Sequence, residues 1–193
     1  SPINAGNVSN KGFEFELGWR DHIKDFHYSV RANIATLKNK VTYIDPSITR
    51  LGGTSFHTYT MTYFEQGYPV YYFRGYKFTG IDPETGDPQF ADLDGSGDLS
   101  DGDRTNIGDA IPDFTYGLTL TAAYKGFDFT LFGTGSQGNQ IYNCINRPDQ
   151  LMTNKLKEEF YDNRWTSDNH AGTRPRAGAN NMDKYACSSA MVY

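Results

Sequence analysis

The chain has 193 residues and a net charge of −5, and 37% of its residues are hydrophobic. Aromatic residues make up 15% of the chain, with 14 Tyr and 13 Phe beside 20 Gly, a composition that favours strands and turns over helices. The mild acidity argues against a nucleic-acid partner, because no cluster of Lys and Arg could replace the counterions of phosphates. We therefore expect an all-β protein.

The N-terminal residues, Ser1-Pro2-Ile3-Asn4, include neither an initiating Met nor the apolar core of a signal peptide. No apolar run approaches the ~20 residues of a membrane helix. We expect this sequence to be a piece of a longer protein. Barrel strands cross a membrane with only about ten residues each, so a β-barrel remains compatible with the sequence.

Four segments alternate between apolar and polar residues with the period of a β-strand. We predict these strands at about 11–20, 26–37, 114–124 and 127–135. The short polar stretches Asp21 to Asp25 and Lys125-Gly126 should join them into two antiparallel hairpins. The second strand should lie beside the third, and Phe132 interrupts the polar side of the last strand.

The two sides of the predicted sheet differ in polarity, as expected when one side faces lipid and the other a polar lumen. The side chains expected on the outer, apolar side are Phe13, Phe15, Tyr28, Val30, Leu118, Leu120 and Phe129. Those expected on the inner side are Arg31, Asn33, Thr119 and Thr121. A soluble β-sandwich would alternate equally well.

Long connections favour the barrel over the sandwich. The segments at about 38–113 and 136–193 are far longer than the connections of compact soluble domains. Short turns at one rim and long loops at the other are typical of outer-membrane barrels. We therefore predict part of a transmembrane antiparallel β-barrel, with short periplasmic turns and extracellular loops at about 38–113 and 136–193.

The first long connection is rich in aromatic residues, which suit either sugar stacking and partner burial or packing of the loop against itself. These residues are Phe56, Tyr59, Tyr63, Phe64, Tyr68, Tyr71 and Tyr72.

A calcium-type loop lies later in this connection, over the twelve residues from Asp92 to Asp103. Oxygen-bearing side chains occupy its positions 1, 3, 5, 9 and 12, Gly97 occupies position 6, and Leu99 supplies the usual apolar anchor. Turn residues flank the loop where an EF-hand has helices. The sequence therefore predicts a structural Ca²⁺ site that orders a long connection.

The expected ligands are side-chain oxygens and one carbonyl, and an acidic turn without a metal is the alternative. They are Asp92, Asp94, Ser96, the Asp98 carbonyl, Ser100, with or without an intervening water, and Asp103. Asp103 is shorter than the Glu that usually closes such loops, which disfavours bidentate closure.

Several motifs resemble those of SusC/RagA-type TonB-linked outer-membrane proteins, in the same order along residues 4 to about 143. The matching stretches are Asn4-Ala5-Gly6-Asn7, Asn10-Lys11-Gly12-Phe13-Glu14, Asn39-Lys40-Val41-Thr42, Gly75-Tyr76-Lys77, Asp92 to Asp103, Ile107-Gly108, Tyr116-Gly117 and Tyr124-Lys125-Gly126-Phe127-Asp128. The family usually has Asn or Asp where this chain has Ser96, which implies a weaker calcium ligand.

The resemblance implies a C-terminal barrel fragment of a bacterial outer-membrane transporter that imports glycans or peptides together with a SusD-like surface lipoprotein. It also implies that the plug and the TonB box lie upstream, outside this chain, so that TonB would act through an absent part of the protein. Two alternatives are a secreted, calcium-stapled β-sandwich that binds carbohydrate and a passive porin-like barrel segment.

An enzyme is not expected. The four His residues show no metal-ligand spacing, and the sequence has neither a phosphate-binding Gly loop that leads into a helix nor a nucleophile elbow. Glu158 and Glu159 are adjacent on a predicted helix over Leu151 to Asn163, where they face different ways. Cys144 and Cys187 could form a disulfide or remain two unrelated thiols.

Overall fold

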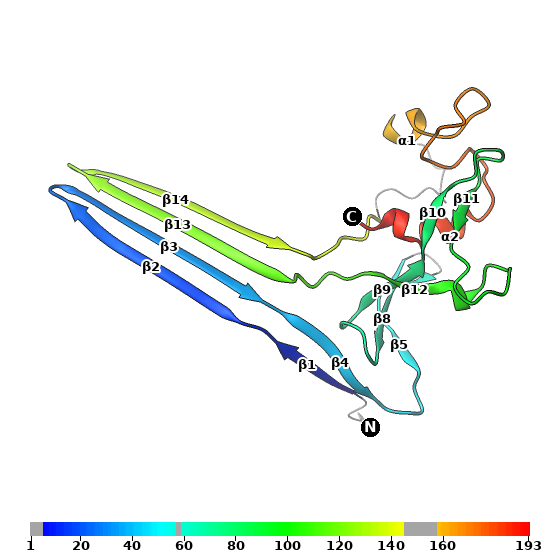
Figure 1. The fold of residues 1–193 in the computed structure, drawn as a ribbon, viewed down its shortest axis with the longest axis horizontal. Helices are drawn as coiled ribbons and strands as arrows, with labels where there is room; N and C mark the ends of the chain where they lie inside the picture. Colours follow the sequence, from blue (N-terminus) through cyan, green and yellow to red (C-terminus); the bar gives the residue numbers. More distant parts are fainter. Residues whose placement is uncertain (1–5, 57–58, 145–157) are drawn as a thin grey trace. The chain divides into compact units, whose positions relative to one another are not determined.

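The computed structural model describes residues 6–56, 59–144 and 158–193. The chain divides into two compact units, which are described separately. Unit 1 combines 1–49, 66–70 and 110–140, and unit 2 combines 50–65, 71–109 and 141–193. The regular structure of both units consists mainly of strands (Figure 1), which confirms the predicted all-β class.

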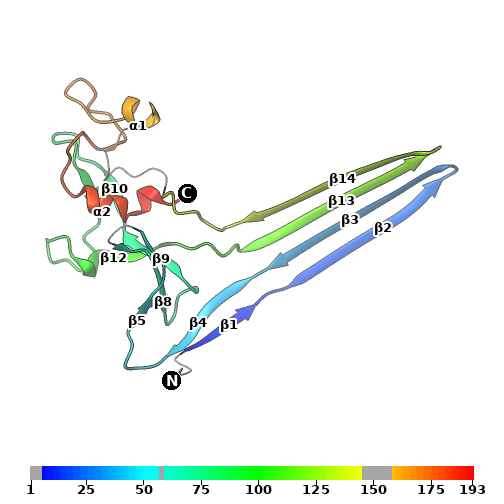
Figure 2. The same cartoon turned by 180° about the vertical axis from the view of Figure 1, so that it is seen from behind.

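Unit 1 contains the predicted four-stranded antiparallel sheet in the order β14-β13-β3-β2. Its strands are β2 (Glu14–Ile23), β3 (Phe26–Thr36), β13 (Phe114–Tyr124) and β14 (Phe127–Gln137). Figures 1 and 2 show the four strands side by side from opposite directions. The predicted pairing is confirmed, because β2 pairs with β3, β3 with β13 and β13 with β14, each in antiparallel register.

The two hairpin turns are both tight. Lys125 and Gly126 form the second turn as predicted, with φ angles of 47° and 88°. The first turn is shorter than predicted: Asp21 and His22 belong to β2, and only Lys24 and Asp25 separate the strands. Backbone pairing of His22 with His27 continues the ladder through residues whose polarity had indicated a turn.

The first hairpin also extends beyond the sheet in the other direction. Strand β1 (Gly6–Lys11) pairs with β4 (Lys38–Ile44), so regular structure continues past the predicted end at residue 37. The first predicted strand, 11–20, is correspondingly replaced by two strands with a break at Gly12 and Phe13. A Cβ atom on Gly12 would collide with the Thr36 carbonyl oxygen, so the break requires a glycine.

The sheet separates apolar from polar side chains, because residues in register share a face. One row across the strands is Trp19, Val30, Leu120 and Leu131, and the adjacent row is Arg20, Ser29, Thr121 and Thr130. The predicted outer and inner sets therefore lie on opposite faces, except for Phe13, which lies in the break between β1 and β2. Phe132 lies in the polar row with Thr119, Arg31 and Gly18.

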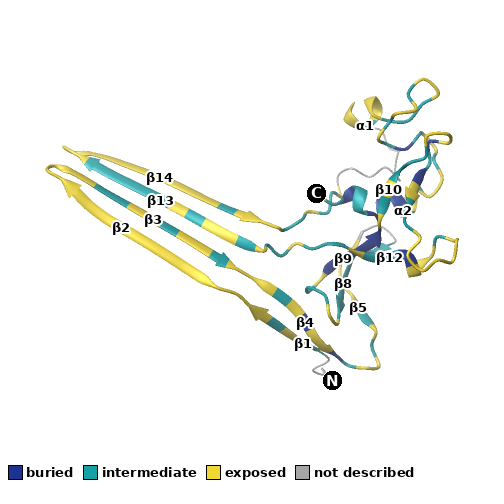
Figure 3. Cartoon of the chain, viewed as in Figure 1, coloured by how far each residue is buried: buried dark blue, intermediate teal, exposed yellow. Residues whose placement is uncertain are grey.

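Large apolar side chains of this sheet are exposed in the isolated chain. Trp19 is 62% exposed and Phe129 is 60% exposed, and most of β2 and β14 is coloured as exposed in Figure 3. Buried residues of unit 1 lie instead in β4, where Val41 and Ile44 are buried. The Val41 amide donates to the Tyr68 carbonyl at 2.9 Å, which attaches residues 66–70 to the hairpin.

Unit 2 contains most of the first long connection, which is folded into short strands. A four-stranded sheet has the order β12-β9-β8-β5, and β10 pairs with β11 and β6 with β7. The strands are β5 (Arg50–Gly52), β6 (Ser55–Phe56), β7 (Tyr59–Thr60), β8 (Thr62–Glu65), β9 (Tyr72–Tyr76), β10 (Phe78–Ile81), β11 (Pro88–Phe90) and β12 (Arg104–Gly108). The connection predicted at about 38–113 therefore contains regular structure of its own.

Short helical segments complete unit 2. They are the 3₁₀ turns η1 (Asp101–Asp103) and η3 (Ser189–Met191) and the helices α1 (Glu158–Asp162) and α2 (Met182–Ala186). The predicted helix over Leu151 to Asn163 is present in its second half as α1, and its part before residue 158 lies outside the described residues. None of the described helices has the length and apolarity required to cross a membrane.

The core of unit 2 joins distant parts of the sequence. Met61, Tyr76 and Cys187 are buried together, and Phe90 and Leu99 pack against them. The Tyr76 amide donates to the Cys187 carbonyl at 3.0 Å. Cys144 is exposed, whereas Cys187 is buried. Because Leu99 belongs to the predicted calcium loop, this core anchors the loop at its eighth position.

Candidate metal centre

The loop from Asp92 to Asp103 turns around the carboxylate of its first residue. Asp92 accepts hydrogen bonds from the amides of Gly95 and Gly97, at 2.7 Å and 3.0 Å. Both glycines have positive φ angles, 72° and 80°, a conformation in which other residues are strained. The loop therefore forms the sharp bend for which a glycine at position 6 was predicted.

The last predicted ligand, Asp103, is fully buried and closes the loop. Its carboxylate accepts hydrogen bonds from the amides of Leu93 at 2.8 Å and Ser100 at 2.7 Å. Ser100 caps the 3₁₀ turn η1 in return, accepting from the Gly102 amide at 3.0 Å. Reciprocal bonds of this kind fix the ends of a helical turn, so Asp103 is held in place before any cation arrives.

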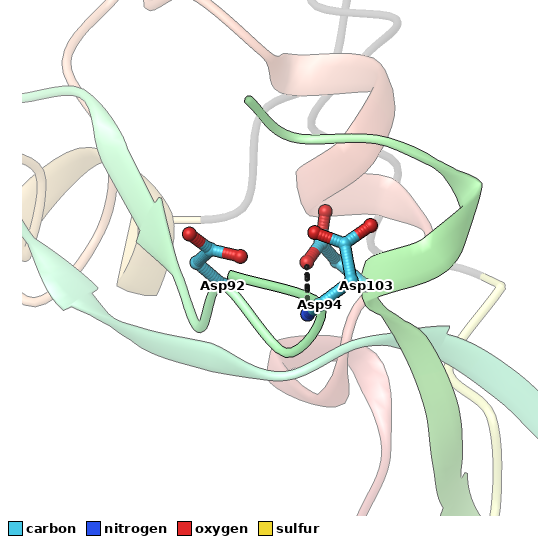
Figure 4. Close-up of side chains that lie close together, drawn as sticks. All are labelled: Asp92, Asp94 and Asp103. Carbon is cyan, nitrogen blue, oxygen red and sulfur yellow. Dashed lines mark hydrogen bonds between the residues drawn. The ribbon is translucent and has the colours of Figure 1, made fainter. Parts of the chain in front are cut away.

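Three carboxylates converge inside the loop. Oxygen atoms of Asp92, Asp94 and Asp103 lie within 4.8 Å of one another, and Figure 4 shows the Asp94 amide directed at the Asp103 carboxylate. Hydrogen bonds from the Ser96 hydroxyl and amide lower the pKa of Asp94. The amides of Ser100 and Leu93 lower the pKa of Asp103. The Asp94 and Asp103 carboxylates therefore stay ionised at neutral pH despite their mutual repulsion.

The remaining predicted ligands are engaged with one another. The Ser96 hydroxyl donates to the Asp98 carbonyl at 2.9 Å, and the Ser100 hydroxyl donates to Asp94 Oδ2 at 3.2 Å. A cation at the centre would take over these oxygen atoms in exchange for the present hydrogen bonds. The donors are all oxygen atoms, carboxylates above all, a set that suits a hard cation such as Ca²⁺ better than a soft metal.

A salt-bridge network beside the loop was not foreseen from the sequence. Asp101, at position 10, contacts the guanidinium groups of Arg50, Arg74 and Arg104 at 3.5, 2.9 and 3.2 Å. Burial raises the pKa of Asp101, but the hydrogen bonds and charges of Arg74 and Arg104 outweigh it, and the net pKa is lowered. The loop motif contains only Asp101 from this network, because the three arginines lie outside the motif at separate places in the chain.

Some aromatic residues of the long connection pack inside unit 2. Tyr72 is buried, and Tyr63 lies under the guanidinium groups of Arg50, Arg74 and Arg104, with 5.6 to 6.0 Å between each group and the ring centroid. Tyr71 remains 52% exposed, and the side chain of Phe56 lies outside the described residues. Packing therefore accounts for Tyr63 and Tyr72 better than sugar stacking does.

Comparison with known proteins gives matches over most of the chain, although no protein-family model matches it. The chain is 34% identical to TonB-dependent receptor P3 of Formosa agariphila over 160 residues, which cover 72% of this chain and 16% of the relative. It is 30% identical to TonB-dependent receptor P26 of the same organism over 212 aligned positions, with coverage of 98% and 21%. TonB-dependent receptor SusC of Bacteroides thetaiotaomicron is 26% identical, with coverage of 72% and 15%.

Solved structures show the same fold. The structure of the RagAB peptide transporter matches with a TM-score of 0.77 at 22% identity, covering 98% of this chain and 22% of that chain. The RagAB peptide importer in its closed-closed state gives a TM-score of 0.78 with the same identity and coverage. The chain spans about a sixth to a fifth of the curated relatives it matches, 16% and 21% for the two Formosa agariphila receptors.

Proposed function

Because the chain belongs to the SusC/RagA family of TonB-dependent receptors, we propose that it forms part of the β-barrel of a transporter that imports nutrients across the bacterial outer membrane. The imported ligand would be a glycan or a peptide. A SusD-like surface lipoprotein would assist uptake, and TonB would act through a part of the protein outside this chain. The proposed role is transport without catalysis.

The main support for this proposal is the amphipathic sheet of unit 1, which has one apolar face and one polar face. One face carries several large apolar side chains that are exposed in the isolated chain, including Trp19 and Phe129, while the opposite face presents Arg31, Thr119 and Thr121. Lipid would cover the first face and the aqueous lumen would contact the second. A soluble sandwich would need a second sheet over the apolar face.

Uptake measurements on the full-length receptor test the proposal. A strain that lacks the gene should lose uptake of peptides from a protein hydrolysate or of oligosaccharides from a polysaccharide digest, and the wild-type gene should restore it. Dissipating the proton gradient should abolish uptake, because TonB-dependent transport consumes energy. Uptake that persists without the gradient would identify a passive pore, and recovery of the protein in the soluble secreted fraction would identify the sandwich alternative.

We further propose that the loop from Asp92 to Asp103 binds one structural Ca²⁺. The support is the convergence of three carboxylates on a preformed loop, since Ca²⁺ would relieve the repulsion between them. Asp92, Asp94 and Asp103 would supply carboxylate oxygens, and Ser96, the Asp98 carbonyl and Ser100 would complete the oxygen set. The ion would hold the loop in one conformation, and no catalytic base lies among its predicted ligands.

Calorimetry on the purified full-length receptor tests the calcium site. The double variant Asp92→Ala, Asp94→Ala should lose calcium binding while the barrel still assembles, because the substitutions lie in unit 2. The exposed residue Asp168 offers a control carboxylate outside the loop, and Asp168→Ala should bind calcium as the wild type does. Equal calcium binding by the wild type and the double variant would reduce the loop to an acidic turn.

A further inference from the structure

Arg74, on strand β9, holds the end of the candidate metal loop at two different points. Its Nη1 atom donates to Asp101 Oδ1 at 2.9 Å, and its Nη2 atom donates to the Asp101 main-chain carbonyl at 2.9 Å and to Oδ2 at 3.2 Å. Only 7% of the Arg74 side chain is exposed. The planar guanidinium fork therefore fixes both the side chain and the backbone of Asp101.

The two neighbouring arginines make different contacts. Arg104 reaches Asp101 Oδ1 at 3.2 Å with Nη1, but its Nη2 atom donates to the carbonyls of Thr60 and Arg74. Arg50 lies 3.5 Å from Asp101 Oδ2 and also 3.5 Å from Glu65. Among the hydrogen bonds of the described side chains, the Asp101 carbonyl is contacted by Arg74 alone.

The Asp101 carbonyl matters because it is part of the turn that carries Asp103. The turn η1 begins at Asp101 and ends at Asp103, and the amide of Arg104 closes it by donating to the same Asp101 carbonyl. Asp103 is the buried carboxylate of the candidate site. A displacement of Asp101 would therefore move the ligand two residues later.

We propose that Arg74 is a positioning residue for the metal loop, which acts through Asp101 to hold the closing turn and the Asp103 carboxylate in the geometry that receives the cation. The inference rests on the calcium site proposed above, and its structural part does not require the metal. The hydrogen bonds of the Arg74 side chain go to Asp101, which is not a predicted ligand, and Arg74 belongs to a strand that precedes the loop motif in the sequence.

Charge and positioning predict opposite effects on calcium affinity. A guanidinium group near a cation site repels the cation, so its removal should tighten binding if charge alone mattered. Loss of positioning should weaken binding, since outer partners that orient metal ligands change affinity by about 10- to 100-fold when removed. The sign of the change in Kd therefore separates the two roles.

Arg50 supplies the matched control, because it carries the same charge beside the same carboxylate without contacting the Asp101 carbonyl. In calorimetric titrations of the full-length receptor with Ca²⁺ alone, Arg74→Gln should raise the calcium Kd by about tenfold or more. Arg50→Gln should leave Kd unchanged or lower it. Arg74→Lys should also raise Kd, because a lysine keeps the charge but cannot reproduce the fork. Unchanged or tighter binding by Arg74→Gln would overturn the proposal.

Amide hydrogen exchange without calcium provides a second measurement. The Leu93 and Ser100 amides donate to Asp103, so Arg74→Gln should accelerate their exchange and Arg50→Gln should not. The Asp82 amide, which donates to the Asp87 carbonyl at 2.9 Å, reports whether unit 2 remains folded. Accelerated exchange in a receptor that binds no calcium would support the positioning role while rejecting the metal site. Unchanged exchange in Arg74→Gln would reject the positioning role.

Discussion

The hydroxyl oxygen atoms of Ser29 and Thr121 lie 2.6 Å apart although 92 residues separate them in the sequence. This hydrogen bond crosses from β3 to β13 and agrees with the direct pairing of the two residues in the ladder. It fixes which residues of the two hairpins share a face. A register shift of one residue would place the polar row on the apolar face.

Adjacent alanines on β13 test the two faces with identical substitutions. Ala122 pairs with Tyr28 and Phe129, whereas Ala123 pairs with His27 and Asp128. Ala122→Arg should destabilise the assembled receptor by about 1–2 kcal/mol, a value between those for charges at the membrane centre and at its surface. Ala123→Arg should be tolerated. Urea unfolding of the receptor in lipid vesicles measures both, and equal losses would contradict the assignment of faces.

The break in the long hairpin should depend on Gly12. A Cβ atom there would collide with the Thr36 carbonyl oxygen, whereas a Cβ atom on Gly18 would meet nothing within 4 Å. Gly12→Ala should cost about 1–3 kcal/mol, as overpacking does elsewhere, and Gly18→Ala should change stability little. The difference can be measured as the temperature at which the electrophoretic band of the folded barrel shifts to the position of the unfolded protein. Equal melting of the two variants would show that the hairpin does not need this close approach.

Gly86 should be sensitive for two separable reasons. It has a φ angle of 73°, and a Cβ atom would collide with the indole ring of Trp165, which donates from Nε1 to the Pro83 carbonyl at 2.9 Å. Gly178 has a similar φ angle of 68° but open space around it. Gly86→Ala should accelerate exchange of the Trp165 amide, and Gly178→Ala should not. A comparable effect of both substitutions would assign the sensitivity to backbone strain.

The turn that begins at Asp82 should lose stability in acid. Hydrogen bonds from the amides of Glu84 and Thr85 lower the pKa of the Asp82 carboxyl in the folded chain. A lowered folded pKa stabilises the turn above the unfolded value, about 3.9, and this stabilisation disappears as the pH falls through the folded pKa. Exchange of the Glu84 and Thr85 amides, corrected for intrinsic rates, should therefore rise below about pH 4. Asp82→Asn should remove this pH dependence, and its persistence would implicate another group.

The sequence predicted the regular sheet because its signal is local and repeated. The alternation in Phe114–Tyr124 defines that strand at both ends, and the Lys125-Gly126 turn follows from short polar residues between apolar ones. The shorter first turn was not predicted, because Asp21 and His22 are polar residues that continue a strand at its end. Strand β4 was not predicted either, since its ladder with β1 contains an irregularity between Asn7 and Val8 and alternates weakly.

In the candidate site, too, the sequence predicted only the features that have a local signal. Spacing alone identified the carboxylates of Asp92, Asp94 and Asp103, because one short segment supplies all of them. The contact between Arg74 and Asp101 depends on the folding of unit 2, and no period or motif relates the two residues in sequence. Packing of Tyr63 beneath three guanidinium groups was equally inaccessible, because a tyrosine in a loop has the same sequence signal whether it is buried or exposed.

The order of pairing in the sheet has a consequence for folding kinetics. Each hairpin joins neighbouring strands through a two-residue turn, so its ends meet at a small entropic cost. Pairing of β3 with β13 must close the long segment between Thr36 and Phe114, and non-local pairing of this kind forms slowly. The two hairpins should therefore form early and independently, and the joining of β3 to β13 should limit the rate at which this part of the sheet assembles.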